Sequence, residues 1–273
     1  MTALQVIWLA LIQGVTELFP VSSLGHAVII PALLHWRVDG EGFLPFLVVM
    51  HLGTAAALLI FFWKSWFDFG QAVVLNRGPQ PAKERALFWR VVVATIPAVV
   101  IGGLFEKVFK RAFSNAELAA AFLIVNGVVL FVVERLRKGV TRRLDELTWA
   151  QALMIGCCQC FALIPGISRS GTTMAGGFLS GLDHEDAARF SFLTATPVIL
   201  GAGVLEVPKL HKLGMHFGLM SMGAGVVAGV AAYVSLWVLM RWFKREEFKA
   251  FDPFAYYCWA AGAIALGLLV VFH

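Results

Sequence analysis

Charged residues are scarce in this chain of 273 residues: Lys, Arg, Asp and Glu make up 14% of it, whereas hydrophobic residues make up 59%. Soluble domains carry about 25% charged residues, so this shortage argues against a soluble protein. The mean hydropathy is +0.80, and several apolar runs approach the roughly 20 residues that cross a bilayer. The composition therefore predicts an integral membrane protein.

The few cysteines and the placement of the positive charge argue against a disulfide-rich, zinc-binding or nucleic-acid-binding protein. Three of the four cysteines crowd one apolar segment, no separated Cys-x-x-Cys pairs occur, and we expect neither a disulfide framework nor a zinc site. The formal charge of +5 would suit nucleic acid, but Lys and Arg cluster in short connections between apolar runs, as orientation signals do. No nucleic-acid partner is therefore expected.

The N-terminal segment, MTALQVIWLALIQGV, lacks the basic region and the cleavage site of a signal peptide. We therefore expect it to be retained.

The apolar runs fall into two kinds. Six are long enough to span: 43–63, 86–105, 116–133, 190–207, 217–240 and 254–272. Four are shorter: 3–19, 24–36, 149–164 and 172–182. They lie in pairs on either side of two short segments rich in Pro, Gly and Ser, FPVSSLGH and IPGISRSGT. Non-helical backbone at membrane depth is tolerated only inside protein or beside water. The short runs therefore predict two re-entrant helix hairpins, over 3–36 and 149–182.

The two hairpins are related by a constant offset. Three pairs of identical residues are 146 positions apart: Gln13 and Gln159, Ser22 and Ser168, Gly25 and Gly171. Three spanning runs follow each hairpin, so we expect an all-α polytopic fold of two repeats, 1–140 and 141–273. An odd number of crossings inverts the second copy, a plan typical of membrane proteins that bind substrate near the midplane.

Loop charge predicts the orientation. Lys and Arg gather in 64–90, 135–143 and 241–249, which six crossings place on one side of the membrane. The positive-inside rule makes that side cytoplasmic and places both termini outside. One hairpin then enters from each leaflet, and we expect the two broken tips to meet in mid-membrane.

The two breaks hold polar side chains that are costly in lipid and usually functional. Glu17, Ser23 and His26 supply a carboxylate, a hydroxyl and an imidazole, and Arg169 supplies a planar cation that suits phosphate oxygens. Ser23, His26 or a water would attack a bound phosphorus, and His26 or Glu17 would transfer the protons. The sequence does not choose among these alternatives.

Further residues are expected to contact the substrate: Gln13, Ser22, Gly25, Ser168, Ser170, Gly171 and Thr172. Free N–H groups where the second hairpin helix opens, at Gly171 and Thr172, would add to an anion cradle. Gly25 lets the chain approach a ligand closely. Gln13 lies one helical turn before Glu17 and would orient it or a bound ion.

Each of these residues also has a structural explanation. Glu17 and Arg169 are able to form a purely structural ion pair, and the serines are able to cap helices or satisfy backbone at the breaks. His51, in the first spanning run, either faces the site or bonds a neighbour. Asn126 has no evident partner.

The motif Gln13-x-x-x-Glu17 followed by PVSSLGH, with PGISRSGTT in the second half, resembles the undecaprenyl-diphosphatase family of the bacitracin-resistance type. The resemblance covers essentially the whole chain. It implies an enzyme of the bacterial inner membrane that hydrolyses undecaprenyl diphosphate to undecaprenyl phosphate and inorganic phosphate. Such enzymes recycle the lipid carrier for peptidoglycan and confer bacitracin resistance. The resemblance also implies an active site open to the periplasmic face and a divalent cation, Mg²⁺ or Ca²⁺.

The family's functional residues carry over by position. Its essential glutamate corresponds to Glu17, its motif serine to Ser23, its histidine to His26 and its arginine to Arg169. Glu17 is also the candidate metal ligand, together with the substrate diphosphate. Two departures stand out: Leu24 replaces the usual threonine, and Gln13 replaces a commoner glutamate, which weakens a two-carboxylate metal site.

Two other functions compete with the phosphatase. A carrier or flippase of an anionic prenyl-phosphate lipid suits the inverted repeat, but it needs no Glu, Ser and His poised for proton transfer. A non-catalytic scaffold leaves the polar tips unexplained. Besides substrate and membrane lipid, a second copy of the chain is a possible partner, although the lipid-facing helix surfaces give no clear dimer stripe, despite Gly223, Gly225 and Gly229 in one run.

Overall fold

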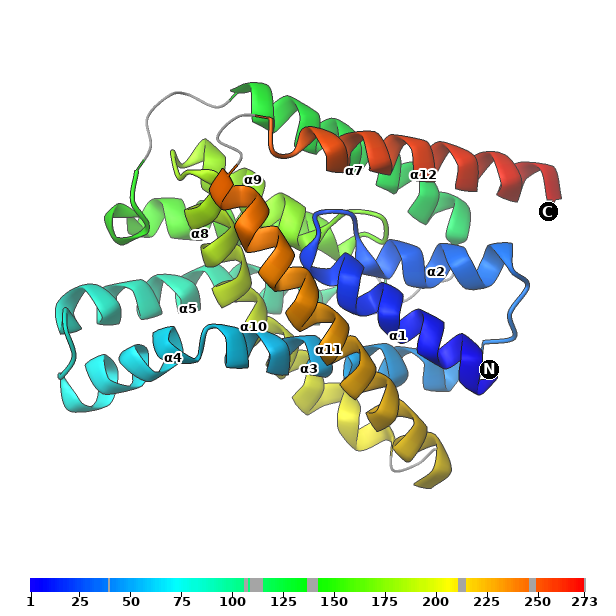
Figure 1. Cartoon of the computed structure of the whole chain (residues 1–273), viewed down its shortest axis with the longest axis horizontal. Helices are drawn as coiled ribbons and strands as arrows, with labels where there is room; N and C mark the ends of the chain where they lie inside the picture. Colours follow the sequence, from blue (N-terminus) through cyan, green and yellow to red (C-terminus); the bar gives the residue numbers. More distant parts are fainter. Residues whose placement is uncertain are drawn as a thin grey trace.

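A computed structural model describes residues 1–38, 40–105, 108, 115–136, 142–210, 215–245 and 249–272. Within these ranges the backbone forms helices and one isolated bridge, between Arg142 and Leu182 (Figure 1). The long helices are α3 (Gly40–Phe61), α5 (Pro81–Leu104), α7 (Ala116–Leu136), α10 (His184–Leu210), α11 (Met215–Arg245) and α12 (Asp252–Phe272). The shorter ones are α1 (Ala3–Leu18), α2 (Ser23–Leu33), α4 (Trp63–Gly70), α8 (Trp149–Cys160) and α9 (Arg169–Leu179), with single turns η1 (Gln71–Leu75), η2 (Leu144–Glu146) and η3 (Phe161–Leu163).

The six predicted spans are confirmed, because each coincides with a helix long and apolar enough to cross a bilayer. The chain is therefore a multi-pass membrane protein. Of these six helices, α5 and α10 extend furthest before the start of their predicted apolar runs. α5 starts at Pro81, since proline suits the first helical turn, and α10 starts at His184 because Asp183 Oδ1 accepts from the Asp186 N–H at 2.7 Å.

Both short helix pairs are interrupted where the sequence predicts. Pro20 disfavours helix at Phe19, whose ψ of 142° is extended, and α1 ends there. The second helix of each pair begins on a serine cap: Ser22 Oγ accepts from Gly25 N at 3.2 Å, and Ser168 Oγ accepts from Gly171 N at 3.1 Å. Residues 146 positions apart thus play the same local role. The α9 helix starts at Arg169 and not at 172, because Ser168 caps it.

The two breaks contact each other. Asn126 of α7 lies between them: its Nδ2 donates to Pro20 O, and its Oδ1 accepts from Ser168 N, both at 2.9 Å. The expectation that Asn126 has no partner is therefore wrong. A Cβ added to Gly25 would lie 3.0 Å from Gly166 Cα, so the close approach of the breaks depends on glycine.

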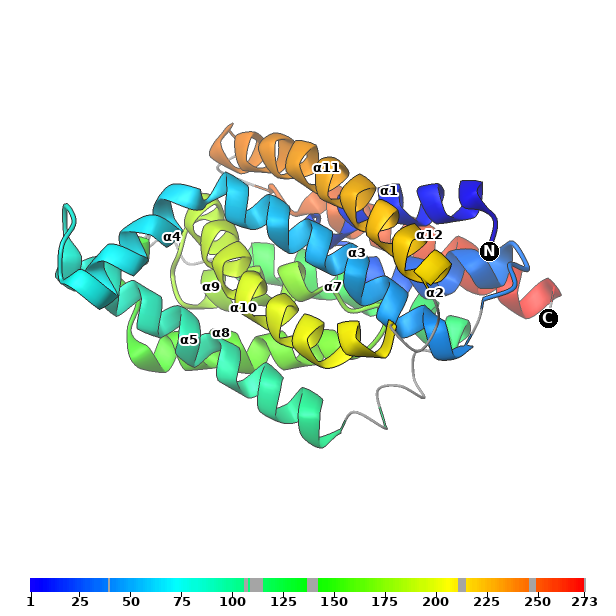
Figure 2. The same cartoon turned by 90° about the horizontal axis from the view of Figure 1, so that it is seen from below.

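The chain termini and the connection from α4 to α5 lie at opposite ends of the molecule. Figures 1 and 2 show both chain termini at one end, where the α1–α2 pair opens, and the α4-to-α5 connection at the opposite end. Ion pairs join the basic connections to other elements: Lys83 to Asp145 of η2, and Arg135 to Asp252 of α12, each at 2.8 Å. Residues 137–141 and 246–248 of the basic groups lie outside the described ranges.

The helices differ in how far the others bury them. The apolar window of α3 and of α10 is 56% buried, against 17% for α5, so α3 and α10 form the interior of the bundle. Gly53 of α3 packs against Gly225 and Gly229 of α11, where an added side chain would clash. Among the cysteines, Cys258 is buried and Cys157 is exposed.

Candidate active site

A cavity of about 210 Å³ lies where the two breaks face α3 and α10. Its walls are mostly aliphatic, with Leu47 and Val48 from α3 and Val198 and Ile199 from α10 among them. Seven residues with polar side chains line it: Glu17, Ser22, Ser23, His51, Gln159, Ser168 and Arg169. A small polar pocket inside an apolar bundle is where a charged ligand group would be desolvated and held.

Glu17 is the centre of the polar network. Its Oε1 accepts from Arg169 Nη2 at 3.0 Å. Its Oε2 accepts from Ser23 Oγ at 2.5 Å and from Gln13 Nε2 at 3.1 Å, and His51 Nε2 lies 3.1 Å from the same oxygen. The Glu17 side chain is only 5% exposed, so this carboxylate depends on the surrounding donors to offset its desolvation.

Arg169 is the first residue of α9 and points into the cavity. Its Nη2 donates to Glu17, and its Nη1 donates to the Ser191 carbonyl at 3.3 Å. The third nitrogen, Nε, is buried, and its N–H has no hydrogen-bond partner in the described part of the chain. A buried donor of this kind costs free energy unless a ligand satisfies it, and phosphate oxygens suit a guanidinium well.

Ser23 and His26 are placed differently. The Ser23 hydroxyl donates to the Glu17 carboxylate, as a nucleophile beside its base would. The His26 ring instead lies between Ser22 O and the Tyr257 hydroxyl, 2.7 Å from each, and is absent from the lining. Glu17, and not His26, is therefore the group in contact with the Ser23 proton.

The predicted substrate-binding residues are divided by the structure. Ser22 and Ser168 line the cavity, and Gln13 contacts Glu17 from the side of α1. The other four are not part of the lining: Gly25, Ser170, Gly171 and Thr172.

The expected anion cradle at the start of α9 is wrong. The Gly171 N–H donates to Ser168 Oγ at 3.1 Å, and the Thr172 N–H donates to Ser168 O at 2.9 Å. Both N–H groups are therefore already used by the helix cap. Ser170 Oγ donates to Phe19 O at 3.2 Å and joins the two breaks.

Two of the seven polar lining residues were not among the predicted site residues. His51 contacts Glu17, and Gln159 is 2% exposed with an Oε1 that has no partner among the described residues. Gln159 is related to Gln13 by the repeat offset, which was the signal in the sequence. For His51 the signal was an ionisable group inside a spanning helix.

The donor set does not form a metal site in this arrangement. Glu17 is the single carboxylate of the lining, and both of its oxygens already accept from protein donors. Mg²⁺ and Ca²⁺ need six or more oxygen ligands. No cluster of three His, Cys, Asp or Glu suited to a metal occurs among the residues that the structure describes.

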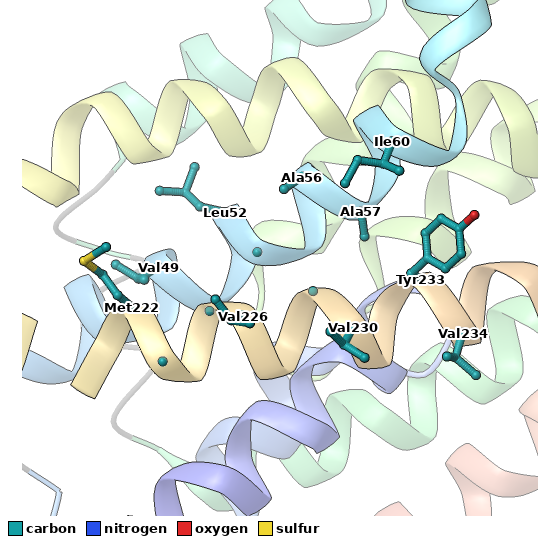
Figure 3. Close-up of a pocket in the computed structure, with 14 residues that line it drawn as sticks. Val49, Leu52, Ala56, Ala57, Ile60, Met222, Val226, Val230, Tyr233 and Val234 are labelled. Atoms are coloured by element: carbon teal, nitrogen blue, oxygen red, sulfur yellow. The ribbon is translucent and has the colours of Figure 1, made fainter. Parts of the chain in front are cut away.

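A second cavity, of about 750 Å³, lies between α3 and α11 and is apolar. Figure 3 shows Val49, Leu52 and Ala56 of α3 beside Val226 and Val230 of α11. Tyr233 supplies the one titratable side chain of its lining. This groove therefore offers no charge to a phosphate.

The fold and site define a class: a multi-pass helical membrane protein with a buried carboxylate, hydroxyl and guanidinium arranged around one cavity. The family described as "Bacitracin resistance protein BacA" matches residues 6–264. This chain belongs to that family.

Relatives resemble the chain along nearly its whole length. A protein named undecaprenyl-diphosphatase from Acidiphilium cryptum is 50% identical, over 98% of this chain and 99% of its own. One of the same name from Granulibacter bethesdensis is 49% identical, over 98% and 97%. Undecaprenyl-diphosphatase 2 from Chromobacterium violaceum is 44% identical, over 97% and 98%.

Proposed function

We propose that this protein hydrolyses undecaprenyl diphosphate to undecaprenyl phosphate and inorganic phosphate in the inner membrane of a bacterium. The observation that carries the proposal is the contact of Ser23, Glu17 and Arg169 in one buried cavity. The relatives' printed name supports the substrate. Removal of the terminal phosphate returns the lipid carrier to peptidoglycan synthesis and lowers the amount of diphosphate that bacitracin can bind.

The reaction begins with attack of Ser23 Oγ on the terminal phosphorus. The Oγ–P bond forms, the bond from phosphorus to the bridging oxygen breaks, and the Ser23 proton moves to Glu17 Oε2 at 2.5 Å. Undecaprenyl phosphate leaves with the bridging oxygen. Glu17 passes the Ser23 proton to the departing undecaprenyl phosphate and is ionised again. Water then attacks the phosphoserine, a water proton moves through Glu17 to the Ser23 oxygen as the Oγ–P bond breaks, and inorganic phosphate departs. Arg169 Nε–H donates to a phosphate oxygen and offsets the charge that develops there.

The divalent cation that the family resemblance implies is proposed to enter with the diphosphate as part of the substrate. The protein's own donors favour this, because Glu17 stands alone as a carboxylate and is fully engaged. Mg²⁺ commonly keeps several waters and binds through substrate phosphates. Calorimetry should then detect no Mg²⁺ or Ca²⁺ binding by the protein alone, whereas EDTA should slow turnover.

We also propose the inverted repeat, with 1–140 and 141–273 as its halves, both termini outside and the cavity open to the periplasmic face. The 146-residue offset of the two serine caps supports the repeat. The predicted homodimer stays a prediction. Such a dimer would not use Gly225 and Gly229, because they pack against α3 of the same chain.

The test is phosphate release by the purified protein from a long-chain prenyl diphosphate. We expect steady release by the wild type and release that is at least about 10²-fold slower by Glu17→Ala or Arg169→Ala. The alternative function, transport of an anionic prenyl lipid, predicts translocation in vesicles without release. The contact of Ser23 with a base favours hydrolysis, because transport needs no activated hydroxyl.

A further inference from the structure

His51 joins the active-site network from a spanning helix. Its Nε2 lies 3.1 Å from Glu17 Oε2, and the two side chains are 14% and 5% exposed. Its Nδ1 lies 2.7 Å from the Leu47 carbonyl oxygen, one turn earlier in α3. A carbonyl oxygen accepts only, so Nδ1 carries a proton and the ring is oriented with Nε2 towards the carboxylate.

The contact differs from the other hydrogen bonds of Glu17 Oε2. Gln13 belongs to α1, as Glu17 does, and cannot fix that helix relative to the rest of the bundle. Ser23 supplies the proton that moves. His51 belongs to α3, one of the two most buried spans, and its ring is held by its own helix. His51 therefore fixes the position of Glu17 Oε2 relative to a helix other than α1.

Helix α3 faces a different cavity on each of two sides. Val49, Leu52 and Ala56 face the apolar groove (Figure 3), whereas Leu47, Val48 and His51 line the polar cavity. The helix thus presents a polar group to the cavity at one position, and that position meets Glu17. Glu17, Arg169 and His51 are the ionisable side chains of that lining among the described residues.

We propose that His51, with both ring nitrogens protonated, is a positioning residue, which holds Glu17 Oε2 against the Ser23 hydroxyl by donating a hydrogen bond from Nε2. This inference rests on the proposed phosphatase function. The last side-chain torsion angle of a glutamate has a broad distribution. Without this donor, the Glu17 carboxylate samples orientations in which it does not accept from the Ser23 hydroxyl. Misplacement of a reacting group by about 1 Å can cost about 10²-fold in rate.

Three variants test the proposal by phosphate release from a long-chain prenyl diphosphate. In His51→Gln the amide nitrogen reaches the place of Nε2 and keeps a donor to Glu17. In His51→Asn the shorter amide reaches only the place of Nδ1, and in His51→Leu no donor remains. We expect kcat to fall about 10²-fold in the Asn and Leu variants, with KM within about threefold of wild type. The Gln variant should recover to within about tenfold of wild type.

Ser235→Ala is the matched control, because Ser235 is a buried donor on spanning helix α11 whose hydroxyl donates to the backbone of its own helix, at Ala231 O. It should turn over as the wild type does. Thermal unfolding separates folding defects from rate effects, and Asn keeps the argument testable if the Leu variant does not fold.

Wild-type kcat in the Asn or Leu variant would overturn the proposal. So would equal losses in Gln and Asn, or a loss confined to KM. A wild type that releases no phosphate would instead contradict the proposed function itself, and it would do so before any variant is compared.

Discussion

The two hairpin breaks share a backbone design and differ in chemistry. In both, a serine caps the second helix by accepting from the N–H three residues on, Gly25 in one and Gly171 in the other. The next residue is Ser23 in the first break and Arg169 in the second, and both line the cavity. One local fold therefore presents a hydroxyl from one side and a cation from the other.

The two breaks have the same backbone geometry, and the residues that differ between them supply the reactivity. Glu17, beside the first break, contacts both of these residues, and the position 146 residues later is the apolar Leu163. Two identical half-sites would place two hydroxyls or two cations together. Divergence at these positions makes one half-site acidic and nucleophilic and the other cationic.

The largest effect should come from the first break. Ser23→Ala removes the attacking oxygen and should lower kcat by at least about 10³-fold, within the range known for loss of a serine nucleophile. Ser168→Ala removes a cap in the second break and should mainly cost stability, about 1 kcal/mol, by thermal unfolding. Comparable rates in the two variants would contradict the division of roles between the breaks.

Removal of the cation should have the next largest effect. Arg169→Ala should lower kcat/KM about 10²–10³-fold, and it should destabilise the fold by about 3–5 kcal/mol because Glu17 loses its buried partner. Arg135→Ala is the control, because Arg135 pairs with Asp252 at the distant end of α7 and is 41% exposed. Its activity should match the wild type. Phosphate release and chemical unfolding measure both effects.

The bridge between the breaks should matter less. Asn126→Ala leaves Pro20 O and Ser168 N without their partner, at about 1–3 kcal/mol for a buried group. We expect a lower unfolding temperature and a moderate fall in kcat. Asn115→Ala, which removes an exposed cap of the same helix, should leave kcat unchanged. Equal kcat in both variants would show that the breaks keep their contact without Asn126.

The smallest effect concerns the connection that leads into α8. A hydrogen bond from Lys83 holds the pKa of Asp145 below its ordinary value. A carboxylate whose pKa is lowered by folding stabilises the fold at pH values above its ordinary pKa. That stability is lost as the pH falls through the lowered pKa. Lys83→Ala should therefore cost at most about 1 kcal/mol at neutral pH, less at acid pH, and nothing in activity. A pH-independent difference in unfolding would contradict this explanation.

Local signals in the sequence predicted much of this molecule. The apolar runs predicted six spans, and the short segments rich in Pro, Gly and Ser predicted the two breaks, because both depend on the residues of one segment. Opposed breaks with Glu17 on one and Arg169 on the other also led to their predicted contact. That contact is seen at 3.0 Å.

Long-range partners could not be predicted in the same way. The orientation of His26 depends on Tyr257, 231 residues later, and the role of Asn126 depends on both breaks at once. The position of one cap also decided the fate of Gly171 and Thr172, since helix α9 began three residues earlier than its apolar run. Side-chain direction at a break is set by the packed fold and not by the neighbouring residues.

The stereochemical course at the terminal phosphorus tests the central claim most directly. A prenyl diphosphate made chiral at that phosphorus with sulfur and oxygen isotopes is hydrolysed, and the configuration of the released thiophosphate is determined. Attack by Ser23 followed by water predicts net retention, because each of the two displacements inverts the centre. Net inversion would show a single attack by water, and Ser23 would then not be the nucleophile that Glu17 activates.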